Sequence, residues 1–219
     1  TLIDKTTASV GVHLGLPLPI NRTQPDYYPL MVLNSYLGEH RTSHGQLMQK
    51  LRRDRGLNYG DYSYVEFWWN PPSTSSPEPG TPRRQQYFSV WLRPLVPSTA
   101  HFALRAALFE LDRVRRDGLT QEDFELARDF LLNYSKLWAQ NLSSRLGYKM
   151  DSQFYGMPYY IDEIDARLKR VTLAEVNAAA KKYLSTENYR AVLVTDKAAD
   201  LKAALEKDEP SPMVYNSPP

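Results

Sequence analysis

Residues 46–69 read QLMQKLRRDRGLNYGDYSYVEFWW. Apolar residues at helical spacing predict a short helix over 46–53, and Gly56 ends it, since glycine tolerates the backbone conformation found at helix C-termini. A long strand is expected over 58–69, and its many aromatic rings indicate that it is covered on both faces or meets a partner. The residues that the short helix is expected to bury are Leu47, Met48 and Leu51.

The segment before this stretch adds a strand and a helix. Residues 7–15 alternate between apolar and polar or small side chains, which is typical of a half-buried strand. A helix is expected after Asp26, which is placed to be its N-cap, and it ends at Gly38. Its buried stripe consists of Leu30, Leu33 and Leu37.

A proline-rich segment follows the long strand and leads to the next one. A second strand is predicted over 86–93, with Phe88, Val90 and Leu92 on its buried face. Five prolines fall within residues 70–82. Because proline cannot donate to a strand ladder, the segment over 70–84 is predicted to be a projecting hairpin loop rather than a domain linker.

The second half of the chain is predicted to be mainly helical. Thr120 with Asp123, and Thr172 with Glu175, have the spacing of capping boxes at helix starts. Strands at both ends of the chain with helices between them indicate an α+β fold, in which one mostly antiparallel sheet carries its helices on one face. The segments expected here are helices over 98–116, 120–144, 172–184 and 198–207, and a strand over 189–195.

Composition excludes several classes of function. The 219 residues include 27 basic and 25 acidic ones, and this near balance gives no global field that favours nucleic acid or an anionic membrane. The absence of cysteine excludes disulfides and thiolate chemistry. Apolar runs are too short for a membrane span. The basic cluster over 50–55 is interpreted as a solvated helix face.

Motifs around the opening stretch resemble the pitrilysin/insulinase family of zinc metallopeptidases. In that family a helix ending in Leu-Gly leads through a loop to a short helix, and Leu-Arg followed by Gly-Leu-x-Tyr enters a strand; the matching segments here are 33–38 and 47–59. Residues 120–127 and 172–176 resemble later helix starts of the family. The order is right over nearly the whole chain, so the resemblance implies the domain type found in mitochondrial-processing-peptidase-like enzymes.

The resemblance implies a split active site. Family enzymes carry His-x-x-Glu-His and a distant Glu on one domain, whereas a second domain of the same fold supplies an Arg and a Tyr seven residues apart. By motif match these are Arg52 and Tyr59. Both are expected to bind substrate: Arg52 as a fork for a carbonyl or carboxylate, and Tyr59 as the catalytic phenol that steadies the oxyanion. Without the resemblance, Arg52 would be interpreted as a surface ion-pair residue and Tyr59 as a strand-edge residue.

No metal site is expected in this chain. It contains no His-x-x-Glu-His, and the nearest pattern, His40 to His44, has Ser43 where the family has its catalytic Glu. Two imidazoles four residues apart bind metal well on one helix face, but this pair falls in the loop after Gly38, which is interpreted as a polar loop. Zinc is therefore expected in a partner domain or subunit.

Two functional hypotheses remain from the sequence. The first is that residues 1–219 form one substrate-binding domain, cut from a longer two-domain protein, that completes the active site of a zinc-bearing domain and is inactive alone. Peptide is expected to bind along an exposed strand edge. The alternative is a scaffold subunit that kept the fold and lost catalysis. A homodimer is left open, and for the compartment the bacterial periplasm or cell envelope is preferred to the cytoplasm.

Overall fold

One five-stranded sheet organises the chain. The computed structural model describes residues 1–40, 42–66, 79 and 82–213. The strands are arranged in the order β1-β5-β2-β4-β3, so β1 and β3 form the two edges. Their bounds are Leu2–Asp4 for β1, Val10–Leu18 for β2, Asn58–Tyr64 for β3, Gln86–Leu95 for β4 and Arg190–Thr195 for β5.

The register separates a helix-covered face from an open face. All the strand pairs are antiparallel except β1 with β5. Along β2, Val10, Val12 and Leu14 are buried, as the alternation predicted. On the opposite face His13 pairs with Trp91 of β4, which in turn pairs with Tyr62 of β3. This row of rings belongs to the open face.

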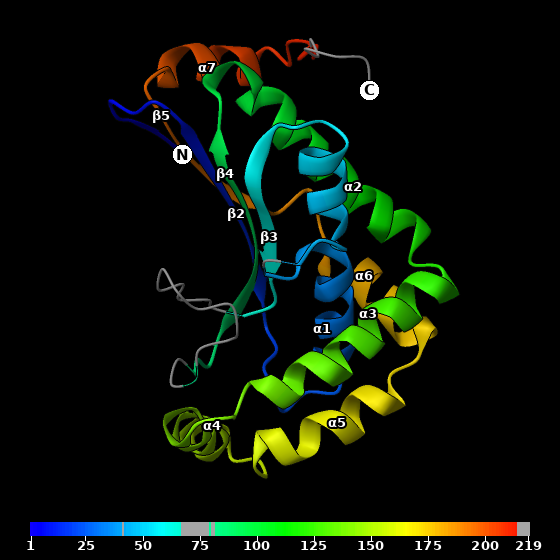
Figure 1. Ribbon diagram of the computed structural model, residues 1–219. Helices are drawn as coiled ribbons and strands as arrows, with labels where there is room; N and C mark the ends of the chain where they lie inside the picture. The colour runs from blue at the N-terminus through cyan, green and yellow to red at the C-terminus, as the bar shows by residue number, and fades with distance from the viewer. Residues whose placement is uncertain (41, 67–78, 80–81, 214–219) are drawn as a thin grey trace.

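The helices cover one side of the sheet, which confirms the predicted fold class (Figure 1). Every residue of α1 is buried, because the helix lies between the sheet and the outer helices. No helix in the described part of the chain has the length and apolar character of a membrane span. The helices are α1 (Tyr27–Gly38), α2 (Ala100–Asp117), α3 (Gln121–Tyr134), α4 (Leu142–Tyr155), α5 (Tyr160–Arg170), α6 (Leu173–Tyr183) and α7 (Ala198–Glu206), with a π-helical turn η1 (Met48–Arg53) and 3₁₀ turns η2 (Pro97–Thr99) and η3 (Ser135–Leu137).

Several expectations need correction. The helix predicted to run from Thr120 to Ser144 ends at Tyr134, and a new helix begins after Asn141, whose side chain accepts a hydrogen bond from the Ser144 amide. At Thr120 the hydroxyl accepts from the Asp123 amide, but the reciprocal half of the capping box is missing, whereas the box at Thr172 and Glu175 is complete. The short strand β1 was not predicted.

Asp26 precedes α1 but does not cap it. Its carboxylate instead accepts hydrogen bonds from Lys182 and Tyr183, at 2.7 and 2.6 Å, and so ties the start of α1 to the end of α6. These donors lower the pKa of Asp26, with the Lys182 bond the largest cause. The Asp26 side chain is therefore held by donors from α6 and makes no N-cap hydrogen bond to α1.

A buried ionic cluster joins the loop before α1, the segment just after β3 and helix α4. Arg22, in the loop before α1, donates to Glu66 at 2.7 Å and to Asp151 of α4 at 3.1 Å. The Arg22 and Asp151 side chains are only 4% and 1% exposed, and the guanidinium lies 4.5 Å from the ring centroid of Tyr160. The strand β3 ends at Tyr64, and Glu66 just after it bonds to Arg22. In the strand predicted over 58–69, residues 65 and 66 form a bend, whereas residues 67–69 and most of the predicted hairpin loop lie outside the described residues.

Candidate functional site

A tight turn between η1 and β3 brings Arg52 and Tyr59 close together. The Gly56 amide donates to the Arg52 carbonyl at 2.7 Å, and the Leu57 amide donates to the Leu51 carbonyl at 3.0 Å. Gly56 has a φ of 63°, in the left-handed region that glycine adopts without steric cost. Leu57 is buried and anchors the turn in the core. The chain thus passes from η1 to β3 with Arg52 and Tyr59 on the two sides of the turn.

Arg52 and Tyr59 are in direct contact. The Arg52 Nη1 atom donates to the Tyr59 carbonyl oxygen at 3.2 Å, and the guanidinium carbon lies 4.2 Å from the centroid of the phenol ring. This stacking holds both side chains in one orientation. Tyr59 is nevertheless 67% exposed. Among the described residues, none bonds to Nε or Nη2 of Arg52, so the outer edge of the fork is available to a ligand.

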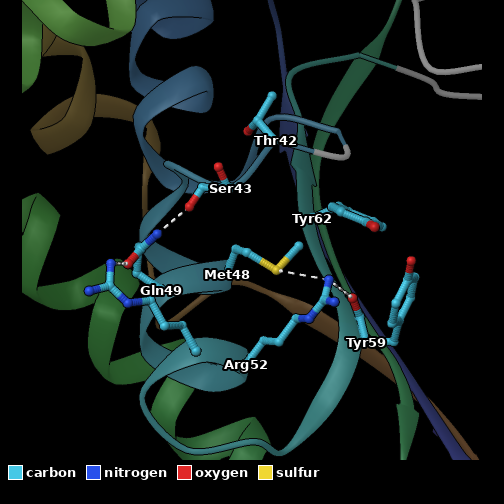
Figure 2. A pocket seen from close by; sticks show the side chains of 8 residues that line it. Thr42, Ser43, Met48, Gln49, Arg52, Tyr59 and Tyr62 are labelled. Atoms are coloured by element: carbon cyan, nitrogen blue, oxygen red, sulfur yellow. Dashed lines mark hydrogen bonds between the residues drawn. The ribbon is translucent and has the colours of Figure 1, made fainter.

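Both side chains line one hollow between η1 and β3. Its volume is about 530 Å³, and Figure 2 shows Arg52 reaching from η1 across to the strand. The sequence placed these two residues in a shared site, and the structure brings them together. The lining consists of Thr42, Ser43, Met48, Gln49, Arg52, Arg53, Tyr59 and Tyr62.

A second hollow lies on the other side of the same tyrosines. Its volume is about 370 Å³, and Tyr59 and Tyr62 are shared with the first hollow. The two hollows therefore adjoin at these tyrosines, and the second extends from β3 across β4 to the start of β2. The lining of the second consists of Ser9, Val10, Gly11, His40, Tyr59, Gly60, Tyr62, Arg93 and Pro94.

Aromatic packing stiffens the wall between the hollows. Tyr62 and Tyr64 are buried against Met48, and Trp91 packs on them from β4. His40 stacks near Tyr62, with 4.8 Å between ring centroids, and its Nδ1 atom lies 2.7 Å from the Tyr64 hydroxyl oxygen. A rigid wall of this kind is suited to holding an extended ligand in register.

The loop between α1 and η1 is more buried than its polar sequence predicted. Glu39 and His40 are only 6% and 2% exposed, and His40 packs against Tyr62 and Tyr64 of β3. Burial raises the pKa of Glu39 to about 7. His40 is thus part of the packed wall, whereas Ser43 in the same loop is exposed.

Asp61 is a second buried carboxyl beside the site. It faces the helices from β3 and accepts a hydrogen bond from Asn58 at 2.6 Å. Its other oxygen, Oδ2, has no hydrogen-bond partner within the described part of the chain. Burial raises the pKa of Asp61 to about 7, partly offset by the Asn58 bond and by the charge of Arg52. No pattern in the sequence marked this carboxyl as buried.

The histidine pair in the loop does not form a metal site. His40 packs against Tyr62 and Tyr64, whereas His44 packs edge-on against Phe130 of α3, at 4.6 Å between centroids. The two imidazole rings thus lie on different sides of β3. In the residues that the structure describes, no cluster of three or more His, Asp or Glu side chains is arranged to hold a metal ion.

The sequence of the chain is similar to a known peptidase domain and to curated zinc proteases. The family model of the peptidase M16 inactive domain matches residues 1–131. An uncharacterized zinc protease of Mycobacterium tuberculosis strain H37Rv is 29% identical over 194 residues, which are 88% of this chain and 40% of the relative. One from Bacillus subtilis strain 168 is 28% identical over 170 residues, covering 77% of this chain and 37% of the relative. The chain thus spans about two fifths of the curated relatives it matches.

Solved structures agree on the fold. The peptidase M16 inactive domain from Pseudomonas fluorescens superposes with a TM-score of 0.68 at 22% identity, covering 88% of this chain and 42% of that one. A protease from Helicobacter pylori superposes with a TM-score of 0.70 at 14% identity, covering 89% of this chain and 43% of the other. At these identities the likeness concerns the fold.

Proposed function

The chain belongs to the M16 peptidase family as a copy of its inactive domain, and we propose that it is the substrate-binding half of a zinc endopeptidase. In this proposal a separate zinc-bearing domain or subunit of the same fold supplies the metal, and the present chain completes the site. Zinc provides the Lewis acid of the reaction. The residues of this chain bind the peptide and stabilise the negative charge that develops on its carbonyl oxygen.

The observation that carries the proposal is the Arg52–Tyr59 pair in its hollow. Arg52 stacks on the Tyr59 ring at 4.2 Å, and no described residue bonds to its Nε or Nη2 atom. A planar guanidinium binds a carbonyl or carboxylate through a fork of parallel hydrogen bonds. The exposed phenol beside it is a hydrogen-bond donor for an oxygen that gains negative charge.

The sheet edge supports binding of an extended peptide. β3 is an edge strand, and Tyr59 lies near its start, beside the hollow. An extended segment adds to a strand edge through main-chain hydrogen bonds, while alternate side chains enter neighbouring hollows. With the helices on one face, the opposite face of the sheet is left for a partner domain (Figure 1).

Replacement of Arg52 by alanine tests the binding role. In an enzyme assembled from this chain and the zinc-bearing half, Arg52→Ala should raise KM and lower kcat/KM about ten- to a hundredfold, because a charged hydrogen-bond donor to the peptide is lost. Steady-state hydrolysis of a quenched fluorescent peptide measures both constants. The matched control is Arg170→Ala, which removes an exposed arginine of α5 that lines neither hollow. Near-normal kinetics for Arg52→Ala would favour the scaffold alternative.

A further inference from the structure

Two side chains hold the backbone carbonyls of Tyr59 and the residue after it. The Tyr59 carbonyl oxygen accepts a hydrogen bond from Arg52 at 3.2 Å. The next carbonyl, that of Gly60, accepts from the Asn58 Nδ2 atom at 3.1 Å, and the same nitrogen donates to Asp61 Oδ1 at 2.6 Å. The Asn58 amide therefore spans the backbone around Tyr59 and is itself held by the Asp61 carboxyl.

Asp61 holds Asn58 from the buried face of β3. Its side chain is fully buried, and it pairs with Leu92 of β4, a core residue on the helix-covered face. Neither Asp61 Oδ2 nor Asn58 Oδ1 has a hydrogen-bond partner in the part of the chain that the structure describes. The bond between Asn58 Nδ2 and Asp61 Oδ1 is therefore the link between the two side chains. A bond to an ionised carboxylate is about twice as strong as one to a neutral acceptor.

The charged group that acts on Asp61 is Arg52 of η1, whose field lowers the pKa of Asp61 against the larger opposite effect of burial. Helix α1 contains no charged residue. On β4, Arg93 lies next to Leu92 in the strand and so belongs to the opposite, open face of the sheet.

The loop between α1 and η1 contributes the other titratable groups of this region. Burial raises the pKa of Glu39 to about 7 and lowers that of His44, which packs on Phe130. His40 packs on Tyr62 on the open face. Glu39 is therefore the second carboxyl that changes charge near neutral pH, and a test must separate it from Asp61.

We propose that Asp61 is a positioning residue for the Arg52–Tyr59 pair, because its ionised carboxylate holds Asn58 against the Gly60 carbonyl and so fixes the backbone that presents Tyr59 to Arg52. Burial raises the pKa of Asp61 to about 7, so the hold on Asn58 strengthens as the pH rises through neutrality. The consequence for catalysis rests on the proposed peptidase function. The link between Asp61 and Tyr59 is a property of this chain alone.

The 219-residue chain tests the link through the Tyr59 ring. Chain containing ring-¹³C tyrosine would be titrated by NMR from about pH 5.5 to about pH 8.5, and Tyr59→Phe identifies the Tyr59 signal among the 15 tyrosines. In the parent chain this signal should move with a midpoint of about 7. Asp61→Asn should abolish the transition, whereas the matched control Glu39→Gln should retain it.

Asn58→Ala tests the route of the link. It should reduce the amplitude of the Tyr59 transition about twofold or more, because the charge of Asp61 then acts only through space. The midpoint should move to higher pH, since the bond from Asn58 lowers the pKa of Asp61. A Tyr59 transition that is absent from the parent, persists in Asp61→Asn or is unchanged in Asn58→Ala would overturn the positioning role.

Melting temperatures check that Asp61→Asn folds. Because burial raises the pKa of Asp61, the folded state loses stability as the pH rises from the ordinary carboxyl range through about 7. Asparagine has no such ionisation, so the variant should melt at or above the parent temperature at about pH 8 and close to it at about pH 5.5.

The assembled enzyme tests the consequence for catalysis. Asp61→Asn should lower kcat/KM about three- to tenfold at about pH 8 and leave it unchanged at about pH 5.5, where the parent carboxyl is itself neutral. The zinc-bearing half is common to both measurements, so its own pH dependence cancels in the ratio. An equal ratio at both pH values would overturn the positioning role. The expected Tyr59 transition without any hydrolysis by the assembled halves would keep the link and refute the proposed peptidase function.

Discussion

Replacing Tyr59 by phenylalanine should lower kcat about a hundredfold in the assembled enzyme, with KM little changed. A phenol that donates to the oxyanion acts mainly in the transition state, so its loss slows the reaction more than it weakens ground-state binding. The ring itself stays, and with it the stacking on Arg52 at 4.2 Å. Steady-state kinetics on one peptide substrate separate the two constants.

The control for Tyr59 is another tyrosine hydroxyl. Tyr189→Phe removes a phenol oxygen from a residue that lines neither hollow and should leave both constants unchanged. The melting temperature of Tyr59→Phe should equal that of the parent, because Tyr59 is 67% exposed. A kcat within a factor of about two of the parent value would show that Tyr59 has no catalytic part.

Replacing Arg22 by alanine should destabilise the chain by about 3–5 kcal/mol, because it removes the buried cation that bonds to the carboxylates of Asp151 and Glu66. Glu66 and the rings around the guanidinium lose their contacts as well. For a chain of this length the melting temperature should fall by roughly 10 °C. Differential scanning calorimetry or thermal circular dichroism measures the change.

An exposed pair is the matched control for Arg22. Arg115 bonds to Asp112 at 2.9 Å with 43% of its side chain exposed, so Arg115→Ala should barely alter the melting temperature. Asp151→Asn in the Arg22→Ala background should recover part of the loss, since it removes a buried negative charge that has lost the Arg22 cation. Equal melting temperatures for Arg22→Ala and the parent would mean that the cluster contributes nothing to stability.

Local patterns in the sequence predicted the framework well. Alternation identified β2 and β4, helical spacing identified α1, and the Thr172 box marked the start of α6. Each of these signals depends on neighbours in the chain. The end of α3 at Tyr134 was not predicted, because the apolar spacing continues through it. Only the N-cap at Asn141 indicates that another helix, α4, begins there.

The sequence predicted only part of the candidate site. Arg52 and Tyr59 are joined by one turn, so a motif could place them together. Arg93 and His40 reach the same tyrosines from a different strand and a different loop, and no spacing rule connects them. The burial of Glu39 and Asp61 likewise follows from tertiary packing, since polar residues in a loop or strand are ordinarily expected to be exposed.

Mixing this chain with the zinc-bearing half is the most direct test of its role. The zinc-bearing half would be assayed alone, with the parent chain, and with the Arg52→Ala, Tyr59→Phe double variant, while the metal content of each is measured after dialysis. Peptide hydrolysis should require both halves, the double variant should restore almost none of it, and zinc should remain with the other half. Full activity of the zinc-bearing half alone, or one tightly held zinc per molecule of the present chain, would contradict the account.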